Sequence, residues 1–475
     1  MNFKEKLLFT FVVILLVFEF YLLKDVPAFW DAISKFRRAS WFLDTNFSSF
    51  VVPTSINSGH PPLWLWSISC FWIIFGKSIW AARLLLLIVN VGVFHQLLNL
   101  SKSLFYKSVP LFAFLLIFVE PTLIGQTTIL NNDMLLLFFT LLALNAILKR
   151  RALILAIALS GLLMTNLRGI YCFLGLGIGH IILNYRGLAN LSKKFIASYL
   201  ISLGIFAIFL CYQWFELGWI IITQNESFST HRESASILRT FKNAIAFFKN
   251  YLDFGRIFYM LPLIFFLLSL KFSRKMRQLL SVESQILLIF LISFSAVFFL
   301  GMVPFSNPMG PRYFLIGYIL ALILFVNLIY ELEWLSQIKR KILLFGSAIG
   351  LVTGHLWIYP STISQGWDSS LAYLNYFSVE NKMLSYLEDN KIPIQEIGTN
   401  IPLGARHVSQ AAIDDRDMLI FSKLDLLSND FILLSNIENT TDDITLLDVK
   451  SNWNPVKEYR SMGVYITLYK NPNEK

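Results

Sequence analysis

The sequence is poor in charge and in cysteine. Only 15% of its 475 residues are charged, whereas 56% are hydrophobic, and the mean hydropathy is +0.61. A soluble chain of this length would carry more charge, so the composition predicts a polytopic membrane protein. The only cysteines, Cys70, Cys172 and Cys211, all fall in apolar segments. This placement argues against a disulfide framework or a cysteine metal site and predicts that they are core residues.

The sequence also lacks a glycine-rich phosphate-binding loop and an internal repeat, so we expect no nucleotide or nucleic-acid partner. What it has instead are long apolar runs. Backbone groups in hydrocarbon must be paired within their own segment, so these runs predict helices. The predicted fold is an all-α membrane bundle with eleven spans, which begin near Leu7, Leu84, Pro110, Leu135, Ala152, Gly169, Ile196, Ile257, Gln285, Phe314 and Ile342.

The orientation of the bundle follows from its basic residues, which short loops retain on the cytoplasmic side. With eleven spans, all six basic clusters fall on one side: Lys4 and Lys6; Lys102 and Lys107; Lys149 to Arg151; Arg186, Lys193 and Lys194; Lys271 to Arg277; and Lys339 to Lys341. We therefore predict a multi-pass protein of the inner (plasma) membrane with a cytoplasmic N-terminus. The loop of residues 24–62 and the tail lie outside. The apolar stretch 63–76 is short for a crossing and predicts a re-entrant or interfacial helix.

The composition changes after residue 360. Residues 361–475 carry a net charge of −6, which leaves +16 for residues 1–360. We predict a membrane domain over 1–360 and a small extracytoplasmic soluble α/β domain over 361–475. Its expected strands are 418–421, 431–435, 444–449 and 464–469, and Ser378 is expected to cap a helix over 379–390.

Polar groups at the ends of spans are costly in a membrane, so each is a candidate site residue. The predicted topology places five of them at external helix ends: Asp31, His60, Asp133, Arg168 and Arg312. Aromatic neighbours would partly desolvate Asp31 and raise its basicity, which suits deprotonation of an acceptor hydroxyl. The alternative for Asp31 and Asp133 is a purely structural acid at a helix start.

The basic candidates could bind the phosphate of a lipid. Arg312 lies between Pro311 and Tyr313 and offers a fixed fork of donors, whereas Arg168 lacks such a frame. His60 precedes two prolines, which hold it in an extended bend. The alternatives are arginines that snorkel to lipid headgroups and an ordinary interfacial histidine. Glu120, before Pro121, is a further candidate for a buried acid.

The order of these motifs resembles a known family. Asp31 follows the first span, and Gly59-His60-Pro61-Pro62-Leu63, Ala81-Ala82-Arg83-Leu84, Asn132-Asp133 and Pro311-Arg312-Tyr313 come after it. This pattern is similar to the bacterial protein-mannosyltransferase-like and aminoarabinose-transferase-like glycosyltransferases of the C-type superfamily. The resemblance covers residues 1 to about 320. It implies a polyprenyl-phosphate sugar donor, catalytic roles for Asp31 and Asp133, and contact between His60 and the lipid phosphate.

This chain departs from the family at one position, because many relatives have Asp-Glu where it has Asp31-Ala32. The expected reaction is inverting transfer of one sugar to an acceptor on the outer face, with the lipid phosphate as leaving group. No cofactor is certain, and a divalent cation stays open. The acceptor is not defined. The competing interpretations are a transporter or flippase of lipid-linked sugars, which would bury polar residues at mid-span beside broken helices, and a non-catalytic scaffold.

Overall fold

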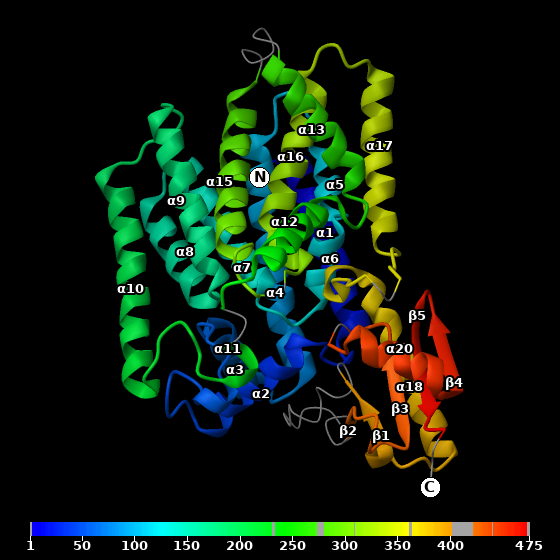
Figure 1. Cartoon of the computed structure of the whole chain (residues 1–475). Helices are drawn as coiled ribbons and strands as arrows, with labels where there is room; N and C mark the ends of the chain where they lie inside the picture. The colour runs from blue at the N-terminus through cyan, green and yellow to red at the C-terminus, as the bar shows by residue number, and fades with distance from the viewer. Residues whose placement is uncertain are drawn as a thin grey trace.

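The computed structural model describes residues 2–229, 233–272, 280–307, 309–360, 363–400, 421–438 and 440–472. Long helices form a bundle, and short helices and a small sheet lie together at the lower end of this bundle in Figure 1. The bundle helices are α1 (Phe3–Leu23), α4 (Ile79–Leu104), α5 (Phe114–Phe118), α6 (Pro121–Thr128), α7 (Asp133–Leu148), α8 (Ala152–Thr165), α9 (Arg168–Tyr185), α10 (Lys193–Leu217), α13 (Ile257–Phe272), α15 (Val282–Met302), α16 (Leu315–Glu331) and α17 (Gln337–Gly354).

The predicted apolar runs coincide with these helices when α5 and α6 are counted together. In the described part of the chain, five helices are long and apolar enough to cross a membrane, or up to seven if each of two bent pairs is one span. At 1.5 Å per residue, α7 with 16 residues and α8 with 14 fall short of a hydrocarbon core of about 30 Å. The multi-pass bundle is therefore seen, and the number of eleven spans stays a prediction.

The two bent helix pairs meet inside the bundle. Helices α5 and α6 bend by 64° around Glu120, and α12 (Ile237–Leu252) and α13 bend by 103° close to Arg256. Arg256 Nε donates to Glu120 Oε1 over 2.8 Å, and both side chains are fully buried. A buried charge is tolerated only when it is paired, so this ion pair holds the two bends together. Glu120 is thus a buried acid, as the sequence indicated.

Short helices cover the lower end of the bundle. They are α2 (Asp31–Asp44), η1 (Thr54–Ile56), α3 (Leu63–Phe75) and α11 (Glu226–Ser229). Ser69 Oγ on α3 donates to the carbonyl of Ala39 on α2 over 2.8 Å. With 13 residues, α3 is about 20 Å long and too short to cross a bilayer, which agrees with a re-entrant or interfacial helix.

The described residues of the tail form a five-stranded sheet in the order β2-β1-β3-β5-β4. Strand β1 is parallel to β2 and β3, whereas β5 is antiparallel to β3 and β4. The elements of the tail are η5 (Trp367–Ser369), η6 (Leu371–Tyr373), α18 (Leu374–Asp389), η7 (Ile394–Glu396), β1 (Ile397–Thr399), β2 (Ser422–Lys423), β3 (Phe431–Ser435), α20 (Asp443–Asn452), β4 (Asn454–Ser461) and β5 (Val464–Lys470).

Two of the predicted strands, 431–435 and 464–469, are confirmed as β3 and β5. The strand predicted over 444–449 is wrong, because this segment lies in α20, where the Asp442 side chain caps the helix by accepting from the Thr445 amide. The predicted helix exists as α18, but it begins at Leu374, since η6 leads directly into it, and Ser378 lies inside it. In the predicted strand 418–421, residues 418–420 lie outside the described residues.

The first residues of the tail pack against residues of the membrane bundle. Phe29, just after α1, packs against Tyr373 with ring centroids 4.7 Å apart, and both belong to one buried apolar cluster that also contains Ile129 and Trp367. The sheet and the first loop therefore occupy the same end of the bundle (Figure 1).

The cysteine prediction holds for one residue only. Cys172 is buried in the bundle, whereas Cys70 and Cys211 are exposed. An apolar helix of a membrane protein can turn such small side chains outward to lipid, so an apolar segment alone does not predict burial.

Candidate active site

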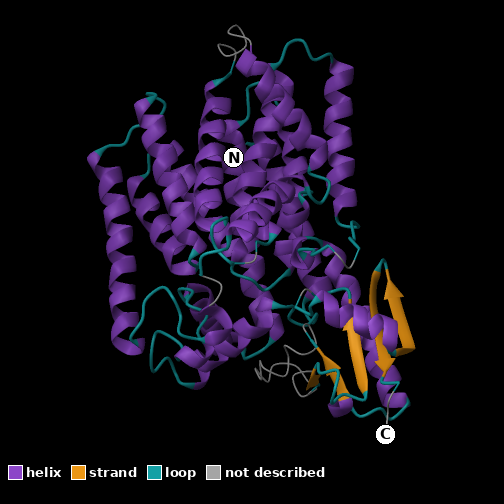
Figure 2. Ribbon diagram, in the orientation of Figure 1, coloured by secondary structure: helices purple, strands orange, loops and turns teal. Residues whose placement is uncertain are grey.

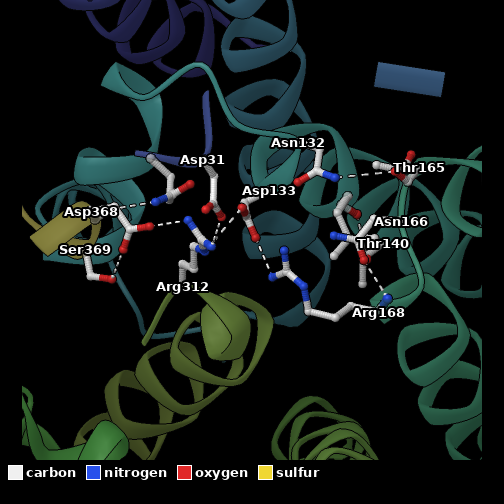
Figure 3. A network of polar contacts seen from close by, with 12 residues as sticks. Asp31, Asn132, Asp133, Thr140, Thr165, Asn166, Arg168, Arg312, Asp368 and Ser369 are labelled. Atoms are coloured by element: carbon white, nitrogen blue, oxygen red, sulfur yellow. Dashed lines mark hydrogen bonds and ion pairs between the residues drawn. The ribbon is translucent and has the colours of Figure 1, made fainter. Parts of the chain in front are cut away.

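Five charged side chains from distant parts of the sequence meet in one cluster (Figure 3). Helix α2, which begins with Asp31, lies at the lower end of the bundle in Figure 1. Four of them were predicted from the sequence: Asp31, Asp133, Arg168 and Arg312. The fifth, Asp368, comes from the tail. The prediction that the first four share one end of the bundle is confirmed.

Arg312 is the centre of this charge cluster. Its Nη2 lies 2.5 Å from Asp31 Oδ2, its Nη1 donates to Asp368 Oδ2, and its Nε lies 3.7 Å from Asp133 Oδ2. Arg168 Nη1 contacts the other oxygen of Asp133 over 2.5 Å. Three carboxylates thus surround one guanidinium, which is only 10% exposed. Arg312 Nε and Asp133 Oδ2 have no hydrogen-bond partner within the described chain, so the cluster is not fully satisfied.

Local structure explains how these side chains are aimed. Pro311 opens the short helix η4 (Pro311–Phe314) directly before α16, and this fixes the backbone at Arg312. Asp133 and Arg168 are the first residues of α7 and α9. An acid at a helix start is favoured by the helix dipole, but a base is not, so Arg168 needs its ion pair with Asp133.

Arg168 also packs against an aromatic ring, which was not predicted from the sequence. Its guanidinium carbon lies 4.0 Å from the ring centroid of Tyr313, a distance typical of a cation–π contact. The neighbour of Arg312 in sequence therefore also orients Arg168. The snorkelling alternative is wrong for Arg168, because its side chain is only 12% exposed and is directed at Asp133.

Asp31 is the most accessible acid of the cluster, with a side chain 52% exposed. It is the first residue of α2, and Trp30 before it has φ +46°, a left-handed conformation that is rare for a bulky residue. Crowding by the protein raises the pKa of Asp31, but attraction to Arg312 and Lys35 outweighs this and places the pKa below its usual range. The prediction of raised basicity is therefore wrong: Asp31 is an ionised carboxylate that the cluster stabilises.

Asp368 was not predicted from the sequence as a site residue. It lies in η5, 56 residues after Arg312 and beyond the last apolar helix, with a side chain only 4% exposed. Burial raises the pKa of Asp368 above its usual value, although Arg312 acts in the opposite direction. No motif in the sequence marks this residue, so only the fold identifies it.

Lys35 was also missed, although the helical spacing offered a signal. It lies one turn after Asp31 on α2 and is only 7% exposed. Burial lowers the pKa of Lys35 to about 7, while Asp31 acts to raise it and Arg312 to lower it. Arg38, one turn further, donates to Ser34 Oγ over 2.9 Å and to Ser58 Oγ. One face of α2 therefore carries an acid and two bases.

His60 lies in the loop before α3 and is half-buried. Its contact with a lipid phosphate stays a prediction.

The acids of the cluster are bound by arginine in this arrangement. Among the residues that the structure describes, no group of three or more histidine, cysteine or acidic side chains is arranged to hold a metal ion. Asp31, Asp133 and Asp368 do converge, but the guanidinium of Arg312 occupies the space between them. The donor set in this arrangement therefore does not fit a divalent cation.

The family model for dolichyl-phosphate-mannose-protein mannosyltransferases matches residues 59–215, about a third of the chain. This part includes His60, Asp133 and Arg168. The resemblance inferred from the sequence is confirmed. The chain is similar to protein-mannosyltransferase-like membrane glycosyltransferases, although no curated protein sequence matches it.

Solved structures extend the likeness to the whole fold. ArnT from Cupriavidus metallidurans bound to undecaprenyl phosphate has a TM-score of 0.50 and 11% sequence identity, over 98% of both chains. At this identity the likeness shows a common fold alone, but it includes the tail as well as the bundle. The oligosaccharyltransferase of Archaeoglobus fulgidus in the apo form has 12% identity and a TM-score of 0.45, over 74% of this chain and 56% of that one.

Proposed function

We propose that this chain is an integral membrane glycosyltransferase that moves one sugar from a polyprenyl-phosphate donor to an acceptor at the extracytoplasmic face. The observation that carries the proposal is the exposed carboxylate of Asp31 held by Arg312 at the end of an apolar helical bundle. The likeness to dolichyl-phosphate-mannose-dependent transferases and to the ArnT fold supports it. The donor sugar and the acceptor, a glycan, lipid or protein hydroxyl or amine, are not specified by these features.

In the proposed reaction the acceptor attacks the anomeric carbon of the sugar. The bond from this carbon to the phosphate oxygen breaks, and the polyprenyl phosphate leaves with one more negative charge. Asp31 accepts the proton of the acceptor, because it is ionised and is the exposed acid of the cluster. Asp133 is the second acid, and its two oxygens orient Arg168 and Arg312.

The cations of the site are proposed to stabilise the leaving phosphate. A guanidinium has five N–H groups, and the hydrogen bonds from Arg312 to Asp31 and Asp368 use two of them. Donors therefore remain for a phosphate oxygen. Arg168 and His60 are the further candidates, and Lys35 joins them on the structural evidence. A phosphate bound to Arg312 partly neutralises the guanidinium, so the attraction between Arg312 and Asp31 weakens and Asp31 becomes a stronger base.

The transporter alternative predicted buried polar groups beside broken helices, and Glu120 and Arg256 are such groups. Both are fully buried and bind each other, and Arg256 also donates to Thr122. They are satisfied by the protein and do not face an aqueous path, so we interpret them as structural. The charge cluster lies instead at helix ends, because Asp31, Asp133 and Arg168 are the first residues of α2, α7 and α9.

The proposed location is the inner membrane, with a cytoplasmic N-terminus and an extracytoplasmic tail. The multi-pass bundle of apolar helices supports a membrane location. The first loop and the sheet lie at one end of the bundle, so both must face the same compartment. A cysteine introduced at the exposed Ser378 is expected to react with an impermeant maleimide added to intact cells. If the cysteine reacted only after cell lysis, the tail would be cytoplasmic and the proposed orientation would be wrong.

The direct test is a reconstituted assay. The purified protein in lipid nanodiscs is expected to release polyprenyl phosphate from a polyprenyl-phosphate sugar when an extract of the native cell envelope supplies the acceptor. Transfer of the labelled sugar to envelope material is the second readout. If the lipid donor crosses the membrane of proteoliposomes intact and no sugar is transferred, the protein is a flippase instead.

The buried Lys35 predicts a pH dependence of donor binding. Below pH 7 its amine is charged and attracts the donor phosphate, and above pH 7 it is neutral. The apparent KM for the donor is therefore expected to rise about tenfold as the pH increases through 7, which corresponds to about 1.4 kcal/mol. Lys35→Arg should keep the low KM above pH 7, and Lys35→Met should show a high KM at every pH.

Lys77→Met is the matched control, because Lys77 lies between α3 and α4 and pairs with Asp44 rather than with the cluster. It should keep the wild-type pH profile. A donor KM that does not change with pH in the wild-type protein, or that still changes in Lys35→Met, would contradict this role for Lys35.

A further inference from the structure

The segment Trp367–Ser370 is seated on α6 by buried contacts to its backbone. Gln126 Nε2 donates to the carbonyl of Asp368 over 2.6 Å, and Thr122 Oγ1 donates to the carbonyl of Ser369 over 3.2 Å. Both donors are fully buried. Backbone carbonyls that are removed from water must be paired, so these two bonds set the position of the segment.

Gly125, between these two donors in sequence, permits the close approach. A Cβ atom at this position would lie 2.7 Å from the amide nitrogen of Ser370 and 3.0 Å from the carbonyl carbon of Ser369. Both atoms belong to the backbone, so a larger residue would force the whole segment away from α6. One more contact, from Tyr373 Oη to Thr128 Oγ1 over 3.0 Å, secures the segment at the end of the helix.

The start of α6, on which the segment lies, is itself held by further buried contacts. The Glu120 side chain caps α6 by accepting from the Leu123 amide over 2.6 Å, and Arg256 holds both Glu120 and Thr122. Thr122 thus touches the buried ion pair and the tail segment at the same time. The result is a continuous set of buried contacts from the two helix bends to the backbone that carries Asp368.

The side chain of Asp368 connects these buried contacts to the charge cluster. Asp368 binds Nη1 of Arg312, while Asp31 binds Nη2. Arginine has a long, flexible side chain, and its planar fork is fixed only when both sides are bound. Without Asp368, Arg312 would keep Asp31 and only the longer approach of 3.7 Å to Asp133, so its guanidinium would follow the exposed carboxylate of Asp31.

We propose that Trp367–Ser370 is part of the transferase site and that Asp368 is a positioning residue that fixes the guanidinium of Arg312 between the carboxylates. The tail is then more than an appended domain, because the site is incomplete without it. This inference rests on the proposed function for its kinetic consequences, but the seat on α6 can be tested without any activity.

The kinetic test compares variants of Asp368. Asp368→Asn keeps the shape but removes the charge, so kcat is expected to fall about tenfold to a hundredfold, the range for a misplaced catalytic group. The KM for the acceptor should change less than twofold. Asp368→Glu keeps the charge and should recover part of kcat. Wild-type kcat in Asp368→Asn, or a loss that Asp368→Glu does not relieve, would overturn the positioning role.

The structural test uses Gly125→Ala with Gly204→Ala as its matched control. Gly204 also lies in a helix, but no atom would lie within 4 Å of its new methyl group. The labelling probe is a cysteine introduced by Ser369→Cys, because Ser369 is fully buried. The exposed Cys70 and Cys211 are replaced by serine in the same protein, so that they do not react. In detergent, Gly125→Ala should expose the probe to a maleimide, and Gly204→Ala should not.

The same two glycine variants, without the probe, are assayed for transfer. Gly125→Ala should lower kcat as Asp368→Asn does, and Gly204→Ala should keep wild-type values. Equal labelling of the probe in both variants would overturn the seat on α6. If the wild-type protein transfers no sugar, the proposed function fails, whereas the labelling result still decides whether the segment is seated on α6.

Discussion

Asp31→Asn is expected to lower sugar transfer by about a hundredfold to ten-thousandfold, the range for loss of a general base. The amide keeps the shape of the side chain and can still accept a hydrogen bond from Arg312, so the fold should persist. What it cannot do is take a proton from the acceptor. The loss should appear in kcat, with the donor KM changed much less, in the reconstituted assay.

The matched control is Asp25→Asn. Asp25 is exposed, and in the contacts described it pairs only with the neighbouring Lys24. It lies a few residues before Asp31 in the sequence but outside the charge cluster. It should keep full activity. Because Asp31 is half exposed, its replacement should leave the thermal unfolding of the detergent-solubilised protein nearly unchanged. Full transfer by Asp31→Asn would remove this residue from the mechanism.

Arg312→Ala is expected to affect both activity and stability. It leaves the carboxylate of Asp368, which is only 4% exposed, without its cation, whereas Asp133 keeps its ion pair with Arg168. An uncompensated buried charge typically costs about 3–5 kcal/mol, so the variant should unfold at clearly lower temperature or denaturant concentration. Donor use should also weaken, by roughly 1.5–3 kcal/mol, the range for hydrogen bonds to charged groups.

A second substitution separates these two effects. In Arg312→Ala combined with Asp368→Asn, the buried carboxylate that lost its cation is gone and Asp133 still pairs with Arg168, so much of the stability should return while transfer stays low. Arg239→Ala, which removes an exposed arginine on α12, should change neither property. If Arg312→Ala kept wild-type stability and wild-type donor use, the cluster would carry neither of the roles assigned to it.

The sequence by itself determined the class of protein and most of the site. Its long apolar runs can be paired in hydrocarbon only as helices, which predicted the bundle. The basic clusters predicted that Asp31, Asp133, Arg168 and Arg312 share one end, and the structure brings these residues into contact. Their motifs are local and lie at helix ends, where a polar residue is conspicuous against an apolar background.

Only the tertiary structure decided which charges act on one another. Asp368 binds Arg312, although the two residues are 56 positions apart in the sequence. This contact forms because Gly125 lets the backbone of the tail lie against α6. The pKa of Asp31 fell rather than rose because Arg312 lies 2.5 Å away, a distance that no periodicity encodes. The segment 444–449 became a helix because Asp442 caps it, although its composition suits a strand. Side-chain type and spacing set local preferences, whereas long-range packing fixes distances, and electrostatic interactions depend on distance.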